Sequence, residues 1–182
     1  MDYFISDLHV GHKNVLKFDS RPFETIEKHD ITIVKNWNKC ITDNDTVYLL
    51  GDISWYSPQM TREFIHILKG KKVWILGNHD HKLQKNQELR KEFEEITDYK
   101  DIKLPNGKHL ILCHYPIPCF KNHFRGSYHF YGHVHKSKEW EIMEKTREMI
   151  VGEFGQPCNM FNVGCMMDYM DYTPRTFDEI VK

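Results

Sequence analysis

The chain alternates short apolar runs with longer polar stretches. Each run is three to five residues long, rich in β-branched or aromatic residues, and sharply bounded, which is typical of buried β-strands. The clearest runs lie near 3–5, 46–50, 73–76, 109–113 and 128–131. The pattern therefore predicts at least five strands.

Apolar residues at helical spacing fill the gaps between the first three runs. One set follows Pro22, and the second set stops at Gly70, a residue that commonly ends helices. The two apolar stripes are Ile26, Ile33, Val34, Trp37 and Ile41, and then Met60, Phe64, Ile67 and Leu68. Alternation of strand and helix predicts an α/β fold with parallel neighbouring strands in this half.

The second half of the chain has a different pattern. Residues 99–104 precede the sequence PNGK at 105–108 and then an apolar run, and Asn-Gly between two such runs favours a β-hairpin. A polar helix is expected over 139–150, and a short closing helix after Thr173 and Pro174. The residues after 155 give no clear pattern.

Composition predicts an ordinary globular protein. The chain has 182 residues, of which 40% are hydrophobic and 28% charged, and this length favours a single domain over 1–182. The formal net charge is -1, so no general positive field attracts nucleic acid. A nucleic-acid partner is therefore open but not favoured.

Cysteines and the N-terminal residues bear on location. The five cysteines are an odd number without a C-x-x-C pair, which favours a reducing compartment over a disulfide framework. The first residues lack the basic and apolar regions of a signal peptide, and no apolar run approaches the roughly 20 residues that span a bilayer. A cytoplasmic protein without a membrane partner is expected, and no oligomeric state is predicted.

Polar side chains that bind metals follow every predicted strand. In α/β sheets, the carboxyl ends of the strands form the ligand-binding edge, where residues distant in sequence meet. The residues at these ends are Asp7 and His9, then Asp52, then Asn78, His79 and Asp80, then His114, and finally His133 and His135. Any one of these groups alone is more typical of a turn or a structural histidine, but all five together favour one site.

Seven of these side chains would supply oxygen or nitrogen ligands, which is too many for one ordinary ion. They are Asp7, His9, Asp52, Asn78, His114, His133 and His135. The pairs Asp7/His9 and His133/His135 are two residues apart and would face the same side of an extended chain. Two divalent ions sharing a bridging carboxylate would use all seven ligands. The ligand chemistry favours Mn²⁺, with Fe, Zn or Ni as alternatives. Four positive charges against two carboxylates would leave a site that attracts phosphate.

The ordered blocks D-x-H, G-D, G-N-H-D, H and G-H-x-H resemble the calcineurin-like metallophosphoesterases, and they span residues 7–135. The resemblance implies an α/β layered sandwich of two mixed β-sheets flanked by helices. It also implies that Asp7, His9, Asp52 and His135 hold one metal ion, and that Asp52, Asn78, His114 and His133 hold the other, with Asp52 bridging. In such a site His79 contacts the phosphate or protonates the leaving oxygen, and Asp80 hydrogen-bonds His79.

Other residues near the blocks are weaker candidates. His12, Arg21 and Arg125 are proposed substrate contacts, and each also fits a capping, packing or solvated role. Trp55 and Tyr56 follow Asp52 and fit either stacking on a base or sugar or a core or lid role. Residues 162–164 are expected to form a structural turn beneath the site.

The expected activity is metal-dependent hydrolysis of a phosphodiester or a small phosphorylated metabolite. A metal-bridging hydroxide would attack phosphorus, and His79 would assist the leaving group. The alternatives are a nuclease with the same chemistry, a protein phosphatase, or a non-catalytic scaffold of the same fold. The scaffold is disfavoured because no residue of the pattern is missing.

Overall fold

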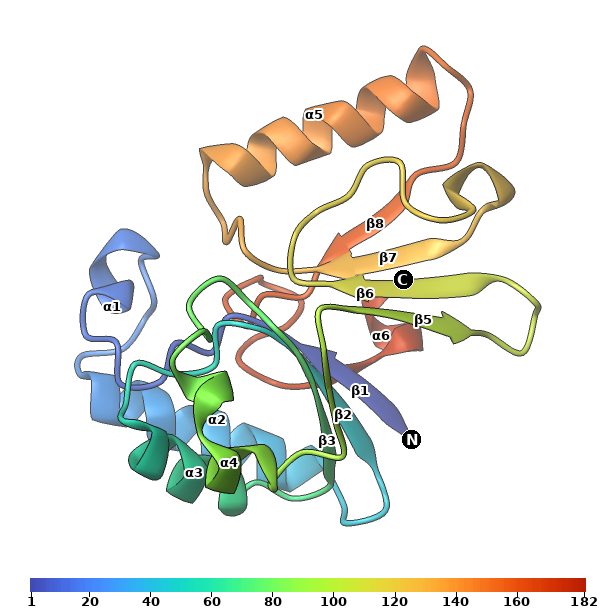
Figure 1. Ribbon diagram of the computed structural model, residues 1–182. Helices are drawn as coiled ribbons and strands as arrows, with labels where there is room; N and C mark the ends of the chain where they lie inside the picture. Colours follow the sequence, from blue (N-terminus) through green and yellow to red (C-terminus); the bar gives the residue numbers. More distant parts are fainter.

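Four parallel strands and one antiparallel strand form the first β-sheet. The computed structural model describes all residues, 1–182 (Figure 1). In this sheet the order is β4-β3-β2-β1-β9. The strands are β1 (Asp2–Ile5), β2 (Thr46–Leu50), β3 (Lys71–Ile75), β4 (Glu95–Thr97) and β9 (Arg175–Thr176). The predicted parallel arrangement of the first three runs is confirmed.

Helices connect these strands and cover one face of the sheet (Figure 1). The Thr25 side chain caps the second helix by accepting from the Lys28 N–H, and Ser57 caps the third by accepting from Met60 N–H. The helices are α1 (Val15–Phe18), α2 (Ile26–Cys40), α3 (Pro58–His66) and α4 (Gln87–Arg90), with a 3₁₀ turn at Leu83–Lys85. The two longer helices lie where the apolar stripes predicted them.

One stripe is narrower than expected. Phe64 and Leu68 are buried, but Met60 is 49% and Ile67 is 55% exposed. Helix α3 ends at His66, before Ile67 and Leu68, and of the predicted face only Phe64 and Leu68 pack against the core.

The second sheet has the order β5-β6-β7-β8. Its strands are β5 (Tyr99–Lys103), β6 (His109–Cys113), β7 (Tyr128–Tyr131) and β8 (Asn159–Asn162), and α5 (Lys138–Gly152) and α6 (Phe177–Ile180) are the remaining helices. The hairpin is confirmed because β5 and β6 pair antiparallel, and α5 covers the outer side of the sheet (Figure 1). Strand β8, which the sequence pattern did not indicate, pairs parallel with β7. The fold is thus an α/β sandwich of two mixed sheets with helices outside.

Aromatic rings from both sheets meet in the core. Phe4 of β1 stacks on Tyr48 with ring centroids 5.2 Å apart, and it meets the edge of Phe130 of β7 at 5.0 Å. All three rings are buried. This contact fixes the two sheets relative to one another, and with them the strand ends that carry the site.

The backbone after β1 joins the two sheets directly. Ser6 N–H donates to Val163 O at 2.9 Å, and Cys165 N–H donates to Ser6 O at 2.9 Å. These bonds place the end of β1 between β2 of the first sheet and the segment that follows β8. No helix of the structure combines the length and the apolar character needed to cross a membrane.

A buried histidine of β7 fastens the loop that follows β6. The His129 Nδ1–H donates to Ile111 O at 3.0 Å, and its Nε2 accepts from Ile117 N–H at 3.1 Å. Both nitrogens are therefore used by the neutral ring. Burial lowers the pKa of His129 to about 4 from its ordinary value of 6.5.

This histidine should make stability depend on pH. Between pH 6.5 and about 4 the unfolded chain protonates His129 and the folded chain does not, so stability falls as the pH is lowered through that window and is unaffected above it. The full loss is about 3 kcal/mol. Urea denaturation in a chelator should show a shallower pH slope in His129→Gln than in the unaltered protein. Equal slopes would contradict the neutral, buried state of the ring.

Candidate metal centre

The backbone of the motif residues adopts an unusual conformation. Left-handed φ values are rare outside glycine, and they concentrate at functional sites. Here they occur at five of the seven predicted ligands, namely Asp7 (φ 55°), His9 (φ 50°), Asp52 (φ 53°), His133 (φ 69°) and His135 (φ 48°). The expectation that Asp7/His9 and His133/His135 lie in extended chain is therefore wrong.

Hydrogen bonds between neighbouring strand ends hold this conformation. Asp7 N–H donates to Gly51 O at 3.1 Å, and His9 N–H donates to Asp52 O at 3.0 Å. The His133 N–H donates to the Asp7 carboxylate at 3.1 Å. Because each bond joins two of the motif blocks, the strained loops support one another.

Two glycines allow the blocks to approach closely. A Cβ at Gly132 would lie 1.9 Å from Ser6 Oγ and 2.3 Å from Asp7 Oδ2, and a Cβ at Gly77 would lie 2.4 Å from Asp52 Oδ1. Real side chains do not approach so closely. Glycine is thus required at both positions by proximity to the buried carboxylates.

Gly132→Ala should therefore destabilise the protein and displace Asp7. Overpacking of this kind costs about 1–3 kcal/mol or more. Urea denaturation in a chelator measures this loss, and metal titration should show weaker binding. Gly152→Ala is the control because nothing lies within 4 Å of its added Cβ. An unfolding free energy equal to that of the control would contradict the close packing at Gly132.

Asp7, His9 and His135 form the first group of potential ligands. His9 Nε2 and His135 Nε2 are 3.0 Å apart. The Asp7 Oδ1 lies 3.5 Å from His135 Nε2 and 3.8 Å from His9 Nε2. His9 Nε2 is also 3.8 Å from Asp52 Oδ2. One carboxylate, two imidazoles and the edge of a second carboxylate thus converge on one point.

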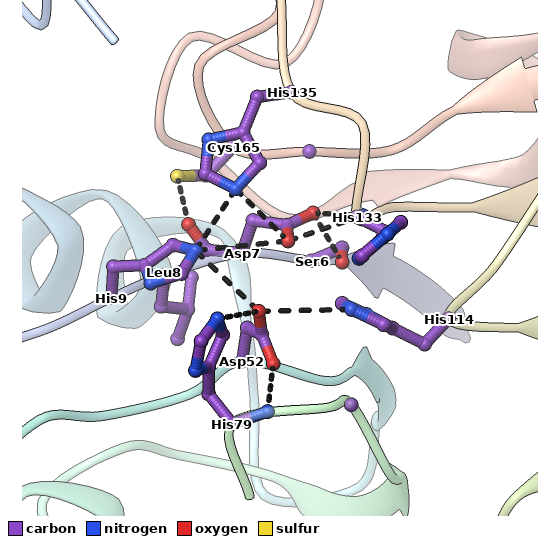
Figure 2. Close-up of polar contacts among 12 residues, drawn as sticks. Ser6, Asp7, Leu8, His9, Asp52, His79, His114, His133, His135 and Cys165 are labelled. Atoms are coloured by element: carbon purple, nitrogen blue, oxygen red, sulfur yellow. Dashed lines mark hydrogen bonds and ion pairs between the residues drawn. The ribbon is translucent and has the colours of Figure 1, made fainter. Parts of the chain in front are cut away.

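Asp52 links this group to a second one (Figure 2). Its Oδ2 lies 3.7 Å from His114 Nε2 and 4.0 Å from His79 Nε2. The Asn78 Oδ1 is 3.0 Å from His114 Nε2 and 2.9 Å from His133 Nδ1. The Asp52 carboxylate therefore lies between the two groups, and its side chain is almost fully buried.

The orientation of the His114 ring is compatible with metal binding. His114 Nδ1–H donates to Leu50 O at 2.7 Å, so the neutral ring carries a lone pair on Nε2. That lone pair faces Asn78 Oδ1, another acceptor, at 3.0 Å. A metal ion, or a proton on Nε2, placed between these two atoms would be favourable, so the pair suits a metal ligand set.

The pKa values of His9 and Asp7 in the first group also favour metal binding. Burial lowers the pKa of His9 to about 4, so its ring is neutral and available as a ligand. Burial alone would raise the pKa of Asp7, but the hydrogen bond from His9 and the charges of His135 and His114 hold it well below its usual range. An ionised carboxylate beside imidazole nitrogens is a donor set that divalent ions bind.

The nearby thiol is not a ligand. Burial raises the pKa of Cys165 to about 12, and the thiol lies 3.2 Å from the backbone oxygen of Asp7, to which it donates. The donor set is therefore oxygen and nitrogen only, as the sequence predicts. The roles of the seven side chains as ligands stay predictions.

His79 is the most exposed histidine at the centre. Its side chain is 49% exposed, and its backbone N–H donates to Asp52 Oδ1 at 3.0 Å. The ring therefore faces the open side of the site, where a substrate would arrive.

The predicted hydrogen bond between Asp80 and His79 is absent. The Asp80 carboxylate instead accepts from the backbone N–H groups of Asp52, Ile53 and Gly77 and from the indole N–H of Trp74, at 2.8–3.2 Å. Four donors occupy the carboxylate, which is completely buried. Asp80 thus ties the ends of β2 and β3 together and positions the Asp52 backbone.

Arg21 is not placed as a substrate contact. It is only 4% exposed, and its guanidinium donates to Asp19 and to the backbone oxygens of Asp7 (2.9 Å) and Leu8 (3.0 Å). It also lies 2.8 Å from His29 Nε2. All these partners are inside the protein, so Arg21 braces the D-x-H loop from behind.

Arg125 lies at the end of the second sheet opposite the metal centre. It belongs to the 3₁₀ turn His123–Arg125, which precedes β7, whereas His133 follows the opposite end of that strand. A four-residue strand separates the two ends by roughly 13 Å. Arg125 is therefore too distant to contact a phosphate held at the centre.

His12 does lie beside the centre. Its ring stacks on Trp55, with centroids 4.1 Å apart and planes at 7°, and both residues line the opening above His9 and His135. Its role as a substrate contact stays a prediction.

Asp19 is a site residue that the sequence pattern did not reveal. Its Oδ2 lies 3.3 Å from His135 Nδ1 and accepts from Arg21 Nε at 2.8 Å. Burial alone would raise the pKa of Asp19, but the hydrogen bond to His135 and the Arg21 charge lower it. A carboxylate on Nδ1 directs the other nitrogen of His135, Nε2, toward the metal position.

Asp19→Asn should weaken metal binding. Loss of such a partner to a metal-binding histidine costs about 10- to 100-fold in affinity. Isothermal titration with Mn²⁺ measures the change, and Asp168→Asn, at an exposed carboxylate, is the control. Affinity equal to that of the control would show that Asp19 does not orient His135.

The segment after β8 forms the turn expected over 162–164. Asn162 Nδ2 donates to His135 O at 2.9 Å, and Asn162 Oδ1 accepts from Gly164 N–H at 3.0 Å. The turn therefore fixes the backbone of the last motif residue.

Comparisons with known proteins find several similar chains. An uncharacterised protein of Methanocaldococcus jannaschii is 31% identical over 183 residues, covering 99% of this chain and 89% of its own length. The Gene 66 protein of Mycobacterium phage L5 is 35% identical over 133 residues, 63% of this chain and 62% of its own length. The crystal structure of a protein of unknown function from Aquifex aeolicus has a TM-score of 0.61 and 28% identity, covering 96% of this chain and 94% of its own.

A family model described as the calcineurin-like phosphoesterase superfamily domain matches residues 3–177. This span includes every motif block and the Asn162 turn beneath them. The match extends the resemblance from the motif blocks to nearly the whole chain. The protein therefore belongs to the calcineurin-like phosphoesterase superfamily, whose general activity is metal-dependent hydrolysis of phosphoesters.

Proposed function

We propose that the protein uses two divalent metal ions to hydrolyse a phosphodiester or a small phosphorylated metabolite. The observation that carries this proposal is the position of the Asp52 carboxylate between two groups of ligand atoms. Its Oδ2 is within 3.8 Å of His9 on one side and 3.7 Å of His114 on the other. Mn²⁺ is the favoured ion, with Fe, Zn or Ni as alternatives, because the donors are carboxylate, amide and imidazole.

The ligands divide between the two positions as the donor geometry suggests. Asp52 would contribute to both ions. Asp7, His9 and His135 would hold one ion, and Asn78, His114 and His133 would hold the other. When bound, the ions supply activation of water and stabilisation of negative charge on the phosphoryl oxygens.

The balance of charge expected at the site with its two ions favours an anionic substrate. Asp7 and Asp52 are the carboxylates that face the two ligand groups, and Asp19 is paired with Arg21 behind them. Two divalent ions would therefore leave the site with a net positive charge. That charge attracts the phosphoryl group and holds it beside the buried ligands.

His79 is the group of this chain that would act on the leaving oxygen. Its exposed ring lies 4.0 Å from Asp52, close enough to reach an ester oxygen on the open side of the site. A positioned imidazole gives its proton to the departing oxygen and prevents formation of an unstable alkoxide. Asp80 contributes by holding the backbone of Asp52 and not by contacting this ring.

Hydrolysis of two chromogenic esters tests the proposal. With Mn²⁺, bis-p-nitrophenyl phosphate should be hydrolysed faster than p-nitrophenyl phosphate, and a chelator should abolish both activities. A monoester preference would contradict the diester part of the proposal. No turnover of either ester by protein shown to hold Mn²⁺ would contradict the proposed activity.

A further inference from the structure

A cavity of about 490 Å³ adjoins the proposed metal centre. It lies between the segments that follow β2 and β3, and Asn78 and His79 belong both to its wall and to the centre. Its volume is in the range of pockets that bind small molecules, about 300–1,000 Å³. A group attached to a phosphate at the centre could therefore extend into this space.

Trp55 provides a fixed aromatic surface in this cavity. Its backbone N–H donates to Val10 O at 2.9 Å, and the neighbouring Ser54 forms an isolated β-bridge with Val10. The indole ring stacks against His12 and also contacts His79 and His9, with centroids 4.5 Å and 4.8 Å away, and 38% of the residue remains exposed. The ring is thus held in place before any ligand binds, which lowers the entropy lost when a flat ring stacks on it.

The charges that line the cavity favour an anionic ligand. Lys82 and His81 line it, and no aspartate or glutamate does. Lys82 takes part in no ion pair of the structure. By contrast, the opening on the other side of Trp55 is lined by Asp19 and Glu139 as well as by a lysine. An exposed indole beside free positive charge suits a ligand that combines an aromatic ring with phosphate.

We propose that this cavity binds the nucleoside part of a nucleotide phosphoester, with the base stacked on Trp55. The inference rests on the proposed function and names the substrate class of that site. The rings of Trp55 and His79 are in contact, with centroids 4.5 Å apart, so a ligand that stacks on Trp55 would reach His79 with the rest of its structure. In hydrolysis the bond from phosphorus to the ester oxygen breaks, the oxygen keeps the electron pair and takes a proton from His79, and water supplies the new P–O bond and restores that proton.

Binding of a product-like pair of ligands tests the proposal. AMP and ribose 5-phosphate share the phosphate and the sugar, and only AMP carries a base. Isothermal titration of the Mn²⁺-loaded protein should show AMP binding about tenfold or more tightly than ribose 5-phosphate. Trp55→Ala should remove this preference, and Trp55→Phe, which keeps a ring and guards against misfolding, should retain part of it.

Tyr99→Ala is the matched control. Tyr99 is an exposed aromatic residue of β5 that lines neither the cavity nor the metal centre, so the preference for AMP should persist. Equal binding of the two ligands, or a preference that survives in Trp55→Ala, would overturn the proposal. Because the titration measures binding, a protein inactive on bis-p-nitrophenyl phosphate would refute the proposed hydrolysis without deciding the base preference. Equal binding of AMP and ribose 5-phosphate would refute the base preference without deciding whether the protein hydrolyses phosphoesters.

Discussion

Asp52→Asn is expected to lower hydrolysis of bis-p-nitrophenyl phosphate about a thousandfold or more, because stabilisation by the ions is worth several kcal/mol. The change keeps the shape of the side chain. The amide oxygen would still accept from His79 N–H, as Asp52 Oδ1 does at 3.0 Å. The amide nitrogen would then replace Oδ2, the atom that lies within 3.8 Å of His9 and 3.7 Å of His114.

An amide nitrogen has no free lone pair for a metal ion, and the negative charge is lost as well. Initial rates at saturating Mn²⁺ measure the effect. Asp168→Asn is the control, since its carboxylate is exposed and pairs only with Lys136. A rate within tenfold of the unaltered protein would show that Asp52 is not shared by two ions.

His79→Gln should slow hydrolysis by about 10²–10⁴-fold, but only for esters whose leaving group needs a proton. An alkyl phosphodiester releases a basic alkoxide and should show the full loss. A p-nitrophenyl ester releases a stable phenolate and should be affected much less. Comparison of kcat for the two esters separates proton donation from a general loss of structure.

Metal content distinguishes this role from that of a ligand. His79→Gln should bind as much Mn²⁺ as the unaltered protein, since no other potential ligand atom depends on the His79 ring. His66→Ala, at an exposed histidine of α3 that pairs only with Glu92, is the control. Equal losses for both esters, or loss of metal, would contradict the assignment of His79 as the proton donor.

The strands that carry the site could be predicted because each is a short apolar run with sharp ends. β4 and β8 could not, since Glu95–Thr97 is partly exposed and Asn159–Asn162 has only two apolar residues between two asparagines. The two-sheet arrangement came from the family resemblance, because nothing in the local pattern says that the hairpin belongs to a separate sheet.

The residue types of the site could be predicted because they follow the strands directly. The backbone conformation of the site could not be predicted. The left-handed backbone at Asp7 and His9 depends on hydrogen bonds to Gly51 and Asp52, more than 40 residues away. No local pattern in the sequence encodes those partners, so an extended chain was the natural expectation.

Contacts between distant parts of the chain also explain why the expected substrate contacts of Arg21 and Arg125 were wrong. Arginine is normally solvated, but Arg21 is buried because Asp19 and several backbone oxygens satisfy it. Asp19 itself follows no strand, and the only signal for it was an acidic residue two positions from that arginine. Arg125 was placed by its nearness in sequence to His133, which ignores the length of the strand between them.

The number of Mn²⁺ ions bound per chain tests the central claim most directly. Equilibrium dialysis followed by elemental analysis should give two ions for the unaltered protein and fewer for Asp52→Asn. One ion in the unaltered protein, or the same number in both, would contradict a centre in which Asp52 joins two metal positions.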